Sequence, residues 1–134
     1  MIDKENNRDE KSKVWLREDG IVYVVVGKTV SEEEVMDLID KIEEILKSVP
    51  GKAKVLVDVG TVAVIRSSSF RNKLAKRLRD TVESRGVEKA AFFGQKLITR
   101  TIVSFIVMAS GLKNLKVFEN KEKALKWLRE ENTK

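Results

Sequence analysis

The sequence contains no cysteine and no histidine among its 134 residues. The absence of cysteine excludes disulfides and thiolate nucleophiles, and the absence of both residues removes the usual protein ligands of zinc, copper and haem. Without histidine, a Ser–His–Asp triad is also excluded. Carboxylates alone could still hold magnesium or calcium, but the sequence has no EF-hand-like or other dense spacing of Asp. We therefore expect neither a metal nor a cofactor.

Long apolar runs are missing as well. No segment approaches the roughly 20 residues of a membrane-spanning helix, and residues 1–13, MIDKENNRDEKSK, lack the apolar stretch of a signal peptide. Hydrophobic residues make up 42% of the chain and charged residues 36%, a balance typical of a globular protein with a charged surface. We predict a flexible polar tail over 1–13 and a single cytoplasmic domain over 14–134.

The net charge of +6 is distributed unevenly. Between Ser31 and Lys47 the chain has seven acids and two lysines, whereas between Arg66 and Arg79 it has six bases and no acid. The basic stretch has no interleaved aromatic residues for base stacking and matches no nucleic-acid-binding motif. We therefore expect protein partners or self-association, and we do not expect nucleic acid to be the partner.

Strand and helix patterns alternate along the chain. Asp19-Gly20 separates two β-branched runs as a hairpin turn does, and Ser31 with Glu34 forms the capping box that opens an amphipathic helix. The order ββαβαβαβα predicts an α/β fold, with a mixed, mostly parallel sheet of about five strands and four helices. The predicted strands span 14–16, 21–26, 54–59, 89–94 and 115–119, and the predicted helices span 31–49, 68–84, 96–110 and 121–131.

Three consecutive serines, Ser67 to Ser69, precede the helix predicted over 68–84. One interpretation is that Ser67 or Ser68 caps the helix, which contributes about 1 kcal/mol. The other is that Ser67 is phosphorylated or that the site binds a phosphate-like anion, because a helix N-terminus carries partial positive charge and unpaired N–H groups. Arg66 and Arg71 would then add charge-assisted hydrogen bonds. A nucleophilic Ser67 would need a base such as Lys96, and no spacing supports that pair, so we expect no enzymatic activity.

Arg71 falls on the helix face that carries Phe70 and Leu74, which is predicted to be buried. A buried guanidinium needs a partner. Arg71 therefore either reaches back to Asp58 at the end of the preceding strand or extends its guanidinium into water.

The helix predicted over 96–110 is apolar nearly all round. We expect its sheet-facing stripe to be Leu97, Ile98, Ile102, Phe105, Ile106 and Ala109, with Met108 at the margin. Val103 and Val107 would then lie on the opposite side, as a contact surface for a second copy, a protein partner or a lipid. Between this helix and the sheet, Phe92, Phe93, Phe105 and Met108 either form plain core packing or line a pocket for a small apolar ligand.

Two stretches of the chain resemble the STAS family (sulfate transporter and anti-sigma-factor antagonist), and most closely its SpoIIAA-like branch. In anti-sigma-factor antagonists an apolar strand ends in Asp, and Asp-Ser-Ser-Gly then opens a helix. Asp58, Ser67 and Ser68 match this pattern, while Arg66 stands in place of the second Asp and Ser69 in place of Gly. The end of the chain matches the SpoIIAA-like pattern at Val117, Phe118, Glu122, Ala124, Leu125, Trp127 and Leu128.

The resemblance implies a STAS fold and a non-enzymatic binding or regulatory module. We predict that it binds a protein partner through the start of the helix at 68–84, from Arg66 to Arg71, under the control of serine phosphorylation or anion binding. The alternative, from another functional class, is a carrier of a small apolar or lipid-like ligand, held between the sheet and the helix at 96–110.

Overall fold

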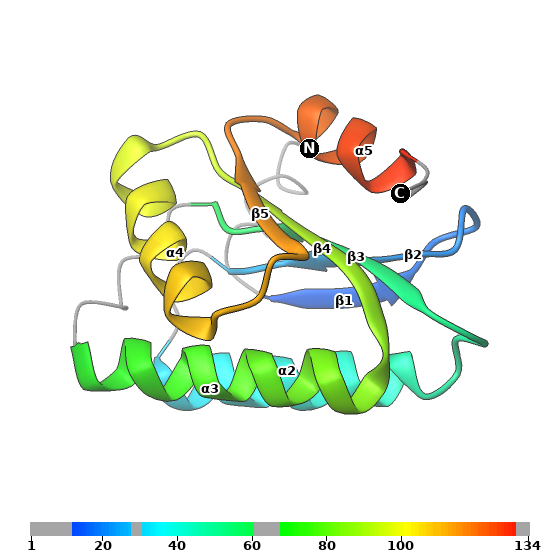
Figure 1. The fold of residues 1–134 in the computed structure, drawn as a ribbon, viewed down its shortest axis with the longest axis horizontal. Coiled ribbons are helices and arrows are strands. Elements are labelled where there is room, and N and C mark those ends of the chain that lie inside the picture. The colour runs from blue at the N-terminus through cyan, green and yellow to red at the C-terminus, as the bar shows by residue number, and fades with distance from the viewer. Residues whose placement is uncertain (1–11, 28–30, 61–67, 131–134) are drawn as a thin grey trace, which may run out of the picture.

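The computed structural model describes residues 12–27, 31–60 and 68–130 (Figure 1). One sheet has the strand order β1-β2-β3-β4-β5. Strand β1 pairs antiparallel with β2, and the other neighbours pair in parallel, which confirms the predicted mixed sheet. The strands are β1 (Lys13–Leu16), β2 (Ile21–Val25), β3 (Ala53–Asp58), β4 (Val87–Phe93) and β5 (Leu115–Phe118).

In the described part of the chain, four helices cover the two faces of the sheet, in the element order predicted from the sequence. Helices α2 (Glu32–Leu46), α3 (Ser68–Arg85) and α4 (Leu97–Ser110) each connect neighbouring parallel strands. Right-handed connections of this kind place the three helices on one face, and α5 (Lys121–Arg129) lies on the other (Figure 1).

The hairpin at the start of the sheet forms where Asp19-Gly20 predicts it. In the register of β1 with β2, Leu16 lies opposite Val22, and the Arg17 N–H donates to the Ile21 carbonyl at 3.0 Å. Gly20 takes the left-handed conformation with φ 83°, which favours glycine. The Asp19 carboxylate accepts a hydrogen bond from the Ile21 N–H at 3.1 Å, so the same residue that marks the turn also stabilises it.

The predicted capping box of α2 is present. The Ser31 hydroxyl accepts from the Glu34 N–H at 3.1 Å, and the Ser31 N–H donates to the Glu34 carboxylate at 2.8 Å. At the other end of the chain, the Asn120 side chain caps α5 by accepting from the Lys123 N–H at 2.9 Å. These local contacts fix where the two helices begin.

The core has two layers because β3 and β4 are buried on both sides. Along β3, Val55 and Val57 pack in the layer under α2, α3 and α4, whereas Leu56 packs in the layer under α5. Within the second layer Leu56 contacts a group that also contains Ile21, Tyr23, Ala91, Ala124 and Leu128.

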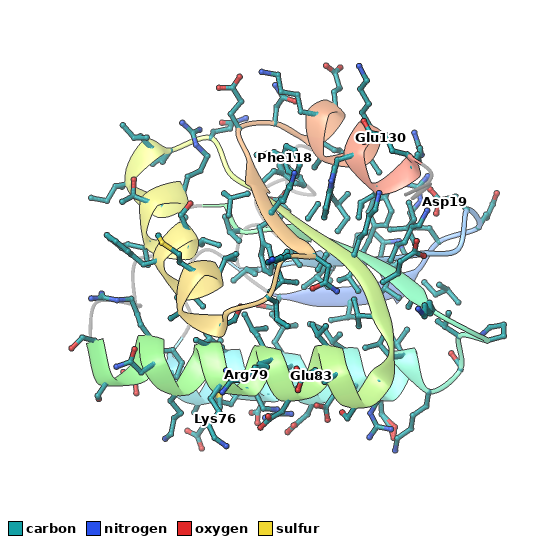
Figure 2. The ribbon with its side chains drawn as sticks, in the orientation of Figure 1. Asp19, Lys76, Arg79, Glu83, Phe118 and Glu130 are labelled. Atoms are coloured by element: carbon teal, nitrogen blue, oxygen red, sulfur yellow. The ribbon has the colours of Figure 1, made fainter. Side chains whose placement is uncertain are left out.

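Polar contacts attach α5 to the sheet and to the hairpin. The Lys89 ammonium, on the buried side chain of a β4 residue, donates to the Trp127 carbonyl at 2.8 Å and to the Glu130 carbonyl at 3.0 Å. The Arg129 guanidinium lies 3.4 Å from the Asp19 carboxylate, and Figure 2 shows Asp19 and Glu130 near one another at this end of the molecule.

Candidate functional site

The start of α3 follows the carboxyl end of β3. Strand β3 ends at Asp58, whose carboxylate accepts a hydrogen bond from the Gly60 N–H at 3.0 Å. Helix α3 begins at Ser68, and both Ser68 and Ser69 are exposed. This confirms that Ser68 and Ser69 lie in the first turn of a helix. Two residues predicted for the site, Arg66 and Ser67, lie outside the described residues.

Electrostatically, the first turn of α3 favours a negatively charged ligand. It contains no acidic side chain that would offset the partial positive charge of the helix N-terminus. Phe70 is buried and Arg71 is half-buried, so the buried ring fixes which side of the turn faces outward. The first turn of α3 therefore presents hydroxyl groups together with the partial positive charge of the helix N-terminus.

The acidic and basic stretches of the sequence pack against each other as α2 and α3. The Arg77 guanidinium lies 2.6 Å from the Asp40 carboxylate and 3.4 Å from the Glu43 carboxylate. The hydrogen bond with Asp40 raises the pKa of Arg77, and the charge of Glu43 adds to this effect while partial burial opposes it. Thr81 completes the contact by donating its hydroxyl proton to Glu43 at 2.7 Å. The opposite charges therefore partly neutralise each other within the molecule, while Lys76 on α3 is exposed (Figure 2).

The predicted orientation of α4 is wrong in part. Ile106 is buried and Ile102 packs against the same cluster, as predicted, but Ala109 and three larger residues of the predicted stripe are exposed. Val103, assigned to the outer side, is buried at 7% exposure, and Val107 packs against the same core. The exposed large side chains are instead Leu97 at 69%, Ile98 at 69%, Phe105 at 56% and Met108 at 68%.

Helix α4 packs with a partly different side inward than predicted because it carries apolar residues on both sides. Two polar residues also face inward. Thr99 and Ser110 are buried. The Ser110 hydroxyl donates to the Val107 carbonyl at 2.6 Å and accepts from the Leu112 N–H at 3.2 Å, so its burial leaves no unsatisfied polar atom. Hydrophobic periodicity alone could not choose between the two sides.

The predicted ligand pocket under α4 is wrong for the same reason. Phe92 and Phe93 are neighbours on β4 and therefore point to opposite faces of the sheet: Phe92 belongs to the layer under α2, α3 and α4, and Phe93 to the layer under α5. Phe105 and Met108 are exposed. The structure does not bring these four side chains together.

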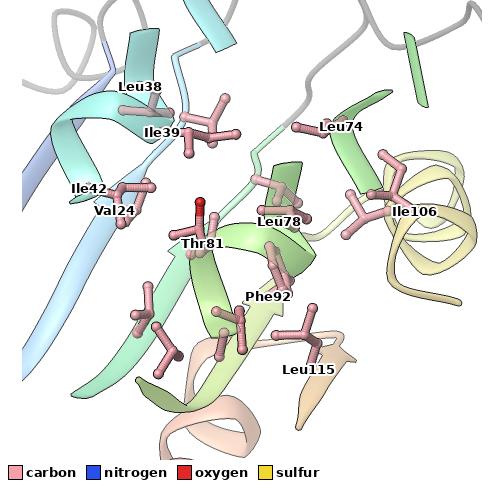
Figure 3. Close-up of a pocket in the computed structure, with 18 of the residues that line it drawn as sticks. Val24, Leu38, Ile39, Ile42, Leu74, Leu78, Thr81, Phe92, Ile106 and Leu115 are labelled. Atoms are coloured by element: carbon pink, nitrogen blue, oxygen red, sulfur yellow. The ribbon is translucent and has the colours of Figure 1, made fainter. Parts of the chain in front are cut away.

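An apolar cavity of about 120 Å³ does exist, but it lies mainly beneath α2 and α3 (Figure 3). Helix α4 contributes Val103 and Ile106 to its wall, and Phe92 is the one residue of the predicted pocket that lines it. Among the described lining residues only Thr81 is polar, and its hydroxyl is engaged with Glu43. Sequence patterns predict which of these residues face inward, but a void depends on their spacing in three dimensions.

The residues that the structure describes contain no cluster of three or more acids that could hold a metal ion. Their helices include none with the length and apolar character needed to cross a membrane.

The mixed five-stranded sheet, with three helices on one face and one on the other, has the architecture of a STAS domain. A model of the SpoIIAA-like family matches residues 21–129, which is most of the chain, and the chain belongs to this family. Membership confirms the resemblance seen in the sequence and makes the chain, in general terms, a STAS-type regulatory module. Comparison with curated proteins and with solved structures finds no match.

Proposed function

We propose that this module acts by binding a protein partner, without catalysis, through the surface from Arg66 to Arg71 at the start of α3. The observation that carries the proposal is the exposure of Ser68 and Ser69 in the first turn of a long helix that follows the carboxyl end of β3. A helix start with hydroxyl groups, nearby positive charge and no acid of its own suits an acidic group on a partner. The protein-binding character of SpoIIAA-like domains in general supports the proposal.

Phosphorylation at Ser67 or Ser68, or binding of an anion there, would regulate this contact. A phosphate adds up to about two negative charges and three strong acceptor oxygens. At the N-terminus of α3, beside Arg66 and Arg71, these oxygens would accept charge-assisted hydrogen bonds and occupy the groups that an acidic partner needs. Intact-mass and phosphopeptide analysis of protein from its natural host tests this control, and a complete lack of modified protein across growth conditions would contradict it.

Site-specific cross-linking tests where the partner binds. A photoreactive side chain at Asn72, near the start of α3, is expected to give a discrete adduct in cells of the natural host. The same side chain at Ser84, near the far end of α3, is the matched control, because both positions are exposed on one helix. Equal adducts from the two positions, or an adduct from Ser84 alone, would place the partner elsewhere.

A second candidate function, a carrier of a small apolar ligand, is favoured by the cavity beneath α2 and α3. Protein interiors pack as densely as organic crystals and contain few voids larger than a water molecule. The 120 Å³ void is close in size to an engineered cavity of about 150 Å³ that stays dry and binds benzene or xenon. Its apolar lining suits a hydrocarbon group of that size.

Filling this cavity tests the carrier hypothesis. Val57→Ile adds one methylene to a lining residue and is expected to raise the free energy of unfolding by about 0.5–1 kcal/mol. It should also reduce the thermal stabilisation that benzene gives to the unaltered chain. Val22→Ile is the control, because Val22 is a fully buried core valine outside the cavity wall, where an added methylene overpacks the core. Equal benzene effects in both variants, or none in the unaltered chain, would contradict binding in the cavity.

A further inference from the structure

The exposed side of α4 carries an apolar stripe that the protein-binding surface at α3 does not use. We define the outer stripe as Leu97, Ile98, Thr101, Phe105 and Met108, all of which are exposed. Positions 98, 101, 105 and 108 recur at intervals of three and four residues and so form one line along the helix. The opposite side of α4 is buried against the core. An exposed helix face normally carries charged residues, whereas this one does not.

The single charged residue of α4 is Arg100, which is not part of the outer stripe but lines the groove beside it. Arg100 donates from one guanidinium nitrogen to the Gly94 carbonyl at 3.0 Å and to the Gln95 carbonyl at 3.2 Å, both in the loop that precedes the helix. Beside the stripe, a groove of about 290 Å³ separates it from β5, with Val117 and Phe118 in its wall. Arg100 and Glu119 also line this groove, so the uncharged surface is the outer stripe itself, and the groove between it and β5 carries charged residues.

We propose that the outer stripe is the interface of a homodimer in which α4 packs antiparallel against α4 of a second copy. Stripe positions are symmetric about the level of residue 103: Ile98 and Met108 lie five residues to either side, and Thr101 and Phe105 lie two. A two-fold axis at this level places Met108 against Ile98 of the other copy and Phe105 against Thr101. Each of these contacts is then made twice, once by each copy, as an isologous interface requires, and Phe105 meets the smaller Thr101.

The available area is sufficient for such a contact. Taking about 200 Å² for the full area of a large apolar side chain, the exposed fractions of Leu97, Ile98, Phe105 and Met108 leave on the order of 500 Å² per copy. Two copies together would bury on the order of 1,000 Å², which reaches the lower bound of specific interfaces. We therefore expect a reversible dimer whose population depends on protein concentration.

Sedimentation equilibrium over a range of protein concentrations tests the dimer. The unaltered chain is expected to shift from monomer to dimer as its concentration rises, and Phe105→Glu should raise the dissociation constant by about 100-fold or more, because it buries two carboxylates near the axis. Leu16→Glu is the control, since Leu16 is an exposed apolar residue on β1, at the opposite edge of the sheet. A strict monomer at all concentrations, or a dimer that Phe105→Glu leaves intact, would overturn the proposal.

Cysteine cross-linking tests the antiparallel register, and the cysteine-free sequence makes single-cysteine variants unambiguous. Ile98→Cys and Met108→Cys are expected to form a mixed disulfide faster than either variant forms one alone. In the proposed register the unlike positions face each other, while like positions are about 15 Å apart along the helix axis at 1.5 Å per residue. Faster cross-linking of like positions would overturn the antiparallel arrangement. Circular dichroism of each variant checks that the exposed substitutions leave the fold intact.

Discussion

Leu128→Ala is expected to lower the free energy of unfolding by about 3–5 kcal/mol, a large part of the roughly 5–15 kcal/mol that stabilises a typical domain. The Leu128 side chain is fully buried, at 0% exposure, between α5 and the sheet. Its removal leaves a void beside Leu56 and Ala91, which the close-packed layer can fill only in part. A helix of nine residues is also too short to persist without its tertiary contacts.

Chemical unfolding in urea, followed by circular dichroism, measures this loss. Leu125→Ala is the matched control, because Leu125 is on the same helix but is half-buried. It removes the same atoms and changes helix propensity equally, so its expected loss is less than half as large. Similar losses for the two variants would show that α5 contributes through its own helical stability and not through the buried layer.

Lys89→Met is expected to lower the free energy of unfolding by about 2–4 kcal/mol, because hydrogen bonds from a charged donor contribute roughly 1.5–3 kcal/mol each. The Lys89 ammonium donates to two carbonyls at the C-terminal end of α5 and lies 4.9 Å from the centre of the Trp127 ring. Methionine keeps much of the side-chain length but donates no hydrogen bond. It also removes the positive charge that stabilises the negative end of the helix dipole.

Lys116→Met separates the effect of the Lys89 hydrogen bonds and charge from the effect of a cation contacting the Trp127 ring. The Lys116 ammonium lies 5.4 Å from the same Trp127 ring, and its side chain is exposed. Loss of an exposed cation–π contact lowers stability by at most about 1 kcal/mol. Thermal and urea unfolding of both variants distinguish the two roles: equal effects would assign the contribution of Lys89 to the ring and not to the carbonyls.

Local sequence signals predicted the elements of this fold well. Asp19-Gly20 and the pair of Ser31 with Glu34 act within a few residues, and the hydrogen bonds that they predict are present. The serine cluster likewise predicted the start of α3 at Ser68. For the hairpin and for α2, the residues that identify the element also make the contact that stabilises it.

Features that depend on distant residues could not be predicted in this way. The orientation of α4 was predicted wrongly in part, because both of its sides are apolar and only packing against the rest of the core decides which one is buried. The predicted ligand pocket under α4 was wrong because it depended on that orientation. The hydrogen bonds by which Lys89 attaches α5 could not be predicted from the sequence, because their carbonyl acceptors lie 38 and 41 residues further along the chain.

The placement of α5 has a consequence for synthesis on the ribosome. The five strands are complete before residues 121–129 leave the exit tunnel, and α5 is the one helix of the described chain on its face of the sheet. Until it docks, the nascent chain exposes Tyr23, Leu56 and Ala91 to water and to neighbouring chains. Chaperones that recognise apolar surface would act in this interval, and stalled translation before residue 121 would release an aggregation-prone product.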